Sequence, residues 1–229
     1  MMVDVAANYA RVREQVVLAA QRSGRPPGAI TIVCAAKTKA PELVRAALAA
    51  GATDIGENYV QEAQEKAALV PEPARWHLIG HLQRNKARSA LRLFTLIHSL
   101  DSVALARELH RQAEKLGVVA RALIEVNLGN ESSKSGIAVQ QLEGLLTEAA
   151  TLSCLRIEGL MTIPPPGPQA EAARPYFRLL ARLREQYVRF PTANIDLREL
   201  SMGMTDDYAV AIEEGATIVR IGRAIFGER

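Results

Sequence analysis

A lysine comes directly after a strongly apolar stretch of the sequence. Residues 29–36 form a nearly continuous run rich in β-branched side chains, typical of a strand buried on both faces, and Lys37 follows it. Partial desolvation at the end of such a strand favours the neutral amine, which can attack an aldehyde and form an imine. Lys39 would strengthen this effect if its side chain pointed the same way. The alternative is a lysine that only extends into solvent, so the interpretation depends on its neighbours.

Two segments near the C-terminus could bind an anion. Each is a short apolar run that leads into a glycine, Gly203 within residues 199–207 and Gly222 within residues 218–227. Glycine lets the backbone approach a ligand closely, and the N–H groups beside it can point at a phosphate. We therefore expect the anion to be held by Ser201, the backbone around Gly203, and the amides of Gly222 and Arg223.

An arginine lies just before the second of these glycines. Arg220 is part of an apolar run, two residues before Gly222, so its side chain could point into a ligand site. A buried guanidinium needs an acceptor, and a pyridine ring nitrogen is one possibility. The alternative is a salt bridge to Glu125 or Glu158, which also lie on predicted strands.

Apolar runs and amphipathic stretches alternate along the whole chain. This order predicts repeated βα units in a parallel sheet, and eight such units favour a closed, TIM-barrel-like (β/α)8 fold over an open doubly wound sheet. In a barrel the first and last strands are neighbours, which would bring Lys37 close to Arg220. The predicted strands are 29–36, 53–55, 76–79, 96–99, 121–127, 156–163, 199–201 and 217–221. The predicted helices are 3–22, 41–50, 57–69, 83–92, 102–116, 139–150, 169–189 and 205–214.

The composition is that of an ordinary globular protein. With 229 residues, 48% of them hydrophobic, the chain is expected to form one domain over residues 1–229. The net charge is only +3 and basic residues alternate with acids, as at 182–185, so nucleic-acid binding is not expected as the main role. No run approaches the roughly 18 apolar residues that span a bilayer, so no membrane partner is expected. Two cysteines without a framework spacing favour a reducing compartment and a cytoplasmic location.

Seven segments, in order and covering nearly the whole chain, carry the residues of a known family. They are 36–41 (AKTKAP), 55–62 (IGENYVQE), 76–86 (WHLIGHLQRNK), 127–136, 159–161 (GLM), 200–204 (LSMGM) and 219–227 (VRIGRAIFG). Together they resemble the pyridoxal phosphate homeostasis protein family. Two positions depart from its pattern, because Ala40 stands where a proline is expected and Arg223 replaces a commoner small polar residue.

This resemblance implies a barrel like the N-terminal domain of alanine racemase, with pyridoxal 5'-phosphate (PLP) held as a Schiff base on Lys37. It also implies a contact between Arg220 and the ring nitrogen of the cofactor, and it places Asn58 and Met161 facing the cofactor. Members of the family are thought to buffer and deliver PLP and to affect amino-acid balance, without an established turnover. The implied phosphate contacts are Ser201, Gly203, Gly222 and Arg223.

Two other functions are open to a barrel of this kind. One is a PLP-dependent amino-acid racemase that uses Lys37 as a base, and the other is a sugar-phosphate aldolase or isomerase. Racemases with this barrel complete their site with a second domain, and residues after Gly227 leave no room for one. An arginine on the ring nitrogen also weakens the electron sink that most PLP reactions need. We therefore expect a non-catalytic, monomeric PLP carrier, with PLP-dependent apoenzymes as candidate recipients.

Overall fold

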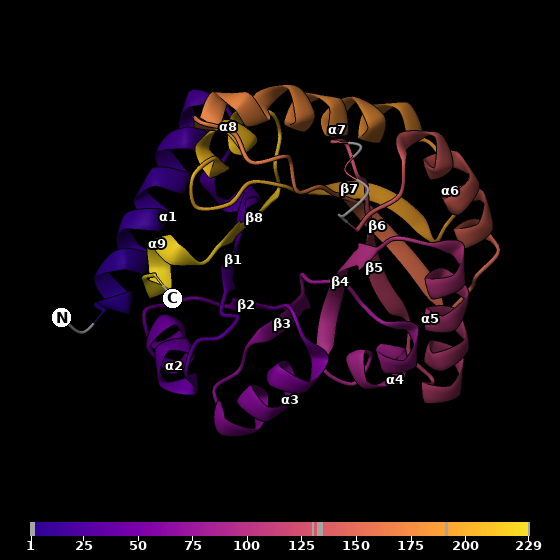
Figure 1. The fold of residues 1–229 in the computed structure, drawn as a ribbon, viewed down its shortest axis with the longest axis horizontal. Helices are drawn as coiled ribbons and strands as arrows, with labels where there is room; N and C mark the ends of the chain where they lie inside the picture. The colour runs from indigo at the N-terminus through magenta and orange to yellow at the C-terminus, as the bar shows by residue number, and fades with distance from the viewer. Residues whose placement is uncertain (1–2, 130, 132–134, 191, 229) are drawn as a thin grey trace.

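In the computed structural model, which describes residues 3–129, 131, 135–190 and 192–228, eight parallel strands form a closed barrel in chain order. Helices surround this ring, and the short α9 near the C-terminus lies beside α1 (Figure 1). The strands are β1 (Thr31–Ala35), β2 (Asp54–Glu57), β3 (Arg75–Leu78), β4 (Phe94–Leu100), β5 (Ala120–Glu125), β6 (Leu155–Met161), β7 (Ile195–Ser201) and β8 (Ile218–Ile221). The α-helices are α1 (Val5–Arg22), α2 (Pro41–Ala49), α3 (Val60–Leu69), α4 (Ala87–Ala90), α5 (Val103–Leu116), α6 (Leu142–Ala150), α7 (Arg174–Tyr187), α8 (Tyr208–Glu213) and α9 (Arg223–Phe226).

The barrel closes between the first and the last strand. β1 and β8 run parallel, with Val33 beside Arg220 and Cys34 beside Ile221. The predicted closed barrel is therefore confirmed, and the open doubly wound alternative is wrong because the eight described strands close into a ring, in which β1 pairs with both β2 and β8. Closure places the turn that follows β1 beside the loop that follows β8.

Local signals in the sequence explain where several helices begin and end. The Ser102 hydroxyl accepts a hydrogen bond from the N–H of Leu105 at 3.2 Å and so caps α5, which ends at Gly117 with a φ of +66°. Pro41 opens α2, where its missing N–H costs no helical hydrogen bond. These ends fix the lengths of the helices that cover the barrel.

Most of the apolar core lies between the strands and the surrounding helices. Helix α7 buries Phe177, Leu180 and Leu183, which are spaced three residues apart and therefore share one face. Helix α1 buries Val12 and Val16 in the same way. We call this layer the outer core.

The inside of the barrel holds a second, smaller apolar cluster. Its side chains come from strands on opposite sides of the ring and contact one another, which is possible only within the barrel. Buried polar groups share this space, since His98 on β4 is hydrogen-bonded to Ser201 on β7. We call this region the barrel interior; its apolar members are Val33, Ile79, Leu96, Leu123, Met161 and Ile218.

Several helices differ from the prediction. The helix predicted at 57–69 begins later, because β2 continues through Glu57. The helix predicted at 83–92 is a 3-10 turn followed by the single-turn α4, the one at 205–214 shortens to α8, and α9 was not predicted. No helix within the described ranges is long and apolar enough to cross a membrane.

Candidate functional site

Lys37 lies in a tight turn just beyond the carboxyl end of β1, and its side chain is half-buried. The next residue, Thr38, has a φ of +62°, a left-handed conformation that β-branched residues rarely adopt. Helix α3 holds the backbone on both sides of the lysine. Lys66 Nζ donates to the carbonyl of Ala36 at 2.8 Å, and the N–H of Thr38 donates to Glu62 Oε1 at 2.6 Å. The position of Lys37 is therefore set by a neighbouring helix.

The side chains that hold this turn form a buried charged cluster. Lys66 Nζ lies 2.5 Å from Glu57 Oε1 and 3.1 Å from Glu62 Oε1, and Lys66 and Glu57 are almost fully buried. Burial raises the pKa of Glu57, although its hydrogen bond to Lys66 opposes this. The second oxygen, Glu57 Oε2, is buried without a partner among the described residues. Such a cluster is costly to disturb, which favours one fixed geometry for the turn.

Lys39 does not reinforce the expected reactive amine in the way the sequence suggested. Its Nζ donates to the carbonyls of Gly227 at 2.9 Å and Glu228 at 2.7 Å. The charge of Lys39 is therefore directed at the backbone near the C-terminus, and it ties the turn after β1 to the end of α9.

The loop after β8 packs against the end of β1. A Cβ atom built on Gly222 would lie 3.1 Å from the Ala35 carbonyl oxygen, so a larger residue would press the two segments apart. Among the described residues, the N–H groups of Gly222 and Arg223 have no hydrogen-bond acceptor, whereas the N–H of Ala224 reaches Thr205 Oγ1 at 3.4 Å. Two free amides thus lie next to the Lys37 turn, as an anion site requires.

The side chain of Arg223 is used elsewhere. Its guanidinium pairs with the exposed carboxylate of Asp206. This pairing fits the expectation that the backbone amide at this position, rather than the side chain, would contact a phosphate.

Gly203 is required by the local backbone. Its φ is +93°, and an added Cβ would lie 2.6 Å from the Cβ of Ala211 on α8. Its carbonyl accepts from the N–H of Arg220 at 3.0 Å, which joins the loop after β7 to β8. The glycine is therefore explained by the turn itself, and its predicted phosphate contact stays a prediction.

Arg220 points into the barrel interior and is almost fully buried. Its Nη1 donates to Ser201 Oγ at 2.6 Å, and its Nη2 donates to the carbonyl oxygen of Thr162 at 2.9 Å. Burial lowers the pKa of Arg220 to about 10, although the charges of Glu125 and Asp207 oppose this. Both partners are neutral, so the guanidinium remains a charged donor in a site that water hardly reaches.

The alternative of a salt bridge for Arg220 is wrong. No carboxylate of the described residues lies within ion-pair distance of its guanidinium, and Glu158 pairs with Arg121 at 2.7 Å instead. Glu125 contributes only at longer range, through its charge.

Ser201 ends β7 and is fully buried. Besides accepting from Arg220, its Oγ lies 2.8 Å from Nδ1 of His98. Met161 ends β6, is also fully buried and lies beside Ser201 in the strand register. The structure thus brings together the ends of β6, β7 and β8 around Arg220. The sequence gives no signal for a role of His98, because its contact with Ser201 joins residues 103 positions apart.

Asn58 occupies a different part of the barrel mouth. It follows β2 directly and lines a pocket of about 230 Å³ together with Glu125 on β5. Burial raises the pKa of Glu125 to about 7; the charge of Asp101 adds to this shift and that of Arg220 opposes it. A carboxyl group that can hold a proton near neutral pH therefore faces this pocket. Its lining residues are Asn58, Ile79, Gly80, His81, Glu125, Val126, Asn127, Ser135 and Ile163.

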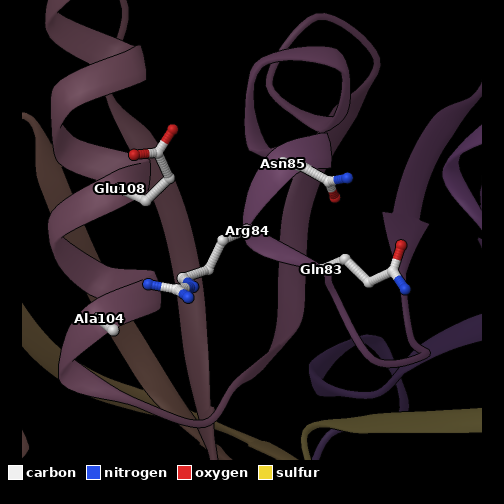
Figure 2. Close-up of a pocket in the computed structure, with 5 residues that line it drawn as sticks. All are labelled: Gln83, Arg84, Asn85, Ala104 and Glu108. Atoms are coloured by element: carbon white, nitrogen blue, oxygen red, sulfur yellow. The ribbon is translucent and has the colours of Figure 1, made fainter.

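A larger hollow of about 510 Å³ lies on the surface beside α5 (Figure 2). In Figure 2, Arg84 extends toward α5, where Ala104 and Glu108 lie, whereas Gln83 and Asn85 point away from that helix. None of the predicted site residues lines this hollow. The candidate site is therefore the barrel mouth.

The chain is similar to known proteins over nearly its whole length. The family model described as alanine racemase, N-terminal domain, matches residues 7–229. The pyridoxal phosphate homeostasis protein of Aquifex aeolicus is 44% identical over 220 residues, which cover 96% of both chains. This chain belongs to the pyridoxal phosphate homeostasis protein family. Among solved structures it is similar to PipY of Synechococcus elongatus with PLP bound, with a TM-score of 0.79 and 37% identity over 94% of this chain and 100% of that chain.

The barrel itself is shared beyond the pyridoxal phosphate homeostasis protein family. Alanine racemase from Bartonella henselae has a TM-score of 0.73 at 17% identity, over 99% of this chain but only 60% of that one. At that identity the likeness concerns the fold alone. The predicted membership of the pyridoxal phosphate homeostasis protein family and the predicted alanine-racemase-like barrel are both confirmed.

Proposed function

We propose that this protein binds PLP as a Schiff base on Lys37 and acts in PLP homeostasis and amino-acid balance. The observation that carries the proposal is Arg220, a buried guanidinium with only neutral partners, on the strand that pairs with the one before Lys37. PipY, the similar protein named above, was solved with PLP bound. The cofactor would supply an aldehyde for the amine and a pyridine nitrogen for the guanidinium.

The residues at the mouth fit such a ligand. A guanidinium has five N–H donors, of which Arg220 uses one for Ser201 and one for Thr162, so others remain for a ring nitrogen. The unbonded amides of Gly222 and Arg223 provide donors for an anion beside β1. Asn58, Met161, Ser201 and Gly203 complete the set of proposed PLP contacts.

The proposed role of the protein around Lys37 is to hold and aim an amine. Helix α3 fixes the backbone on either side of the lysine through Lys66 and Glu62, so the base of the lysine side chain is held in one place. Reduced freedom in the reactive geometry favours imine formation, because less entropy is lost when the bond forms.

Trapping of the amine tests the assignment of Lys37. The purified protein incubated with PLP should show a visible absorption band, and borohydride reduction followed by peptide mapping should place the label on Lys37. Lys37→Ala should lose the band and keep the fold. Lys39→Ala is the matched control and should keep the band, because Lys39 Nζ is directed at the C-terminal backbone. A label on another lysine would contradict the proposal.

We also propose that the site holds PLP without turning over amino acids. The chain matches pyridoxal phosphate homeostasis proteins over nearly their whole length, and a guanidinium partner disfavours protonation of the ring nitrogen. Protein loaded with PLP and incubated with amino acids in deuterated water should leave their α-protons unexchanged. Catalysed exchange for any of the common amino acids would establish the racemase alternative instead.

We propose that in the cell the protein is a cytoplasmic monomer that passes PLP to PLP-dependent apoenzymes. Both cysteines are free in the structure, which is compatible with a reducing compartment. Reconstitution of a PLP-free apoenzyme by the loaded protein, at a rate above that of spontaneous PLP release, would support delivery.

A further inference from the structure

Five buried side chains form a continuous hydrogen-bonded series inside the barrel. Asp54 Oδ1 lies 2.9 Å from His77 Nε2, and His77 Nδ1 lies 2.9 Å from His98 Nε2. His98 Nδ1 lies 2.8 Å from Ser201 Oγ, which accepts from Arg220 Nη1 at 2.6 Å. Asp54 is the first residue of β2 and Ser201 the last of β7, so the series runs the length of the barrel. We call these five residues the interior relay.

At the Asp54 end of the interior relay, the hydrogen bond can run in only one direction. Hydrogen bonds from His77, Arg75 and Thr53 outweigh the effect of burial and hold the pKa of Asp54 well below its usual range, so it is a carboxylate at neutral pH. A carboxylate only accepts, and therefore Nε2 of His77 must carry the proton between them. The fork of Arg75 already neutralises Asp54, through Nε at 2.8 Å and Nη2 at 2.6 Å. A second positive charge on His77 is therefore not needed.

The position of the proton on His77 then determines the direction of the next two hydrogen bonds. A neutral His77 with its proton on Nε2 has a bare Nδ1, which must accept from Nε2 of His98. Burial is the largest cause that holds the pKa of His98 well below its usual range, and the charge of Arg220 adds to it, so this ring is neutral too. Its Nδ1 is therefore bare and accepts from the hydroxyl of Ser201.

The hydrogen bond at the Arg220 end of the interior relay requires the same direction. Arg220 can only donate, so Ser201 Oγ accepts from Nη1 and has its single proton left for His98. Every donor in the series then points from Arg220 toward Asp54. In the opposite direction, a neutral His77 would turn a bare Nε2 toward the carboxylate of Asp54, with no proton between them, and only a doubly protonated His77 would restore one.

We propose that Asp54, His77 and His98 are positioning residues, which fix the direction of the interior relay and thereby aim Arg220 at the mouth. Ser201 then serves as the acceptor that orients the guanidinium, and its hydroxyl proton goes to His98 and not to a phosphate, so that the proposed PLP contact of Ser201 becomes an indirect one, through Arg220. The anion is left to the backbone amides after β7 and β8. The part of this inference that concerns a bound ligand rests on the proposed function.

The direction can be measured in the protein without PLP. Spectra that correlate ring nitrogens with ring protons in 15N-histidine-labelled protein distinguish a protonated from a bare nitrogen. The chain has four histidines, and a variant with His81→Gln and His110→Gln leaves only His77 and His98 to be observed. We expect both rings to be neutral and protonated on Nε2. A proton on Nδ1 of His98, or two protons on His77, would overturn the proposal.

Asp54→Asn tests what sets the direction. The amide keeps the size of the side chain but can donate or accept, so both rings should become mixtures of two tautomers. Glu158→Gln is the matched control, because Glu158 is also a buried carboxylate held by arginines but contacts no histidine in the part of the chain that the structure describes. It should leave both rings protonated on Nε2. Unchanged tautomers in Asp54→Asn would show that the carboxylate does not set the direction.

Measurements of PLP binding test whether the direction of these hydrogen bonds affects the proposed function. Asp54→Asn should shift the visible band of bound PLP and weaken PLP affinity roughly three- to tenfold, as expected when one hydrogen bond loses its fixed geometry. Glu158→Gln should bind PLP like the unmodified protein and with the same band. An Asp54→Asn variant with unchanged affinity and band would refute the positioning role. A complete lack of PLP binding by the unmodified protein would refute the proposed function instead, while the ring spectra would still decide the direction.

Discussion

The outer core and the barrel interior are built on different principles. The outer core is apolar almost throughout, whereas the interior combines a small apolar cluster with fully buried His98 and Ser201 and with Arg220. Apolar burial contributes roughly 25 cal/mol per Å² whatever its direction. A buried polar group must find a partner in a particular direction, or it destabilises the fold. Apolar packing outside the strand ring therefore provides most of the stability, whereas hydrogen bonds inside the ring hold polar side chains in fixed orientations.

Phe177→Ala tests the outer core and should have the largest effect. Phe177 is fully buried on α7, and loss of its ring would leave a cavity and lower the free energy of unfolding by about 3–5 kcal/mol. Urea denaturation measures this change, and PLP affinity should stay within about twofold. The control is Leu179→Ala on the same helix, where the side chain is exposed and the loss should stay below about 0.5 kcal/mol. A large fall in PLP affinity for Phe177→Ala would show that the two regions are coupled.

Arg220→Met tests the barrel interior, and it should change PLP affinity more than stability. The free energy of unfolding should change by less than about 2 kcal/mol, because relief from burying a charge offsets the lost hydrogen bonds. PLP affinity should fall roughly 10- to 100-fold, since a hydrogen bond from a charged group contributes about 1.5–3 kcal/mol. Absorbance titration and urea denaturation give the two quantities. Intact affinity with a severe loss of stability would mean that Arg220 is a structural residue only.

Glu125→Gln should have the smallest effect, and one that depends on pH. The pKa of Glu125 is raised from 4.5 to about 7 by burial and by Asp101, against the opposing charge of Arg220. The folded state therefore keeps this proton at a pH where the unfolded chain has lost it. The resulting stabilisation is complete below pH 4.5 and is lost as the pH rises through 7.

Urea denaturation over a pH series measures this contribution. The unfolding free energy of the unmodified protein, relative to the variant, should fall by about 1–2 kcal/mol between about pH 5.5 and 7.5. A difference that stays constant over this range would mean that Glu125 ionises normally in the folded state.

Much of the fold could be predicted from local patterns. The β-branched run before Lys37 indicates a buried strand without any knowledge of its partners, and the same holds for the other runs that became strands. Closure follows from their number and order, and it places Lys37 near Gly222. The four-residue helices α4 and α9 were missed or overextended because a single turn shows no helical periodicity.

The interior could not be predicted in the same way. His98 sits within an expected strand, but whether its ring faces inward depends on the register of the strand and on a partner 103 residues away. For Arg220 the sequence left open a ligand nitrogen or an acidic partner, and within the protein the structure gives a hydroxyl and a backbone carbonyl. A hydroxyl and a backbone carbonyl carry no charge, so no pattern of charged residues in the sequence indicates them.

The left-handed backbone of Thr38 has a consequence for how the lysine can move. Such a conformation costs of order 1–3 kcal/mol in a residue other than glycine and persists only where its surroundings impose it. Here that constraint comes from Glu62 and Lys66, so relaxation of the turn would be downhill as soon as α3 shifted. We therefore expect the release of the proposed ligand from Lys37 to respond to substitutions at Glu62 and Lys66, which lie on α3 and are not among the proposed PLP contacts.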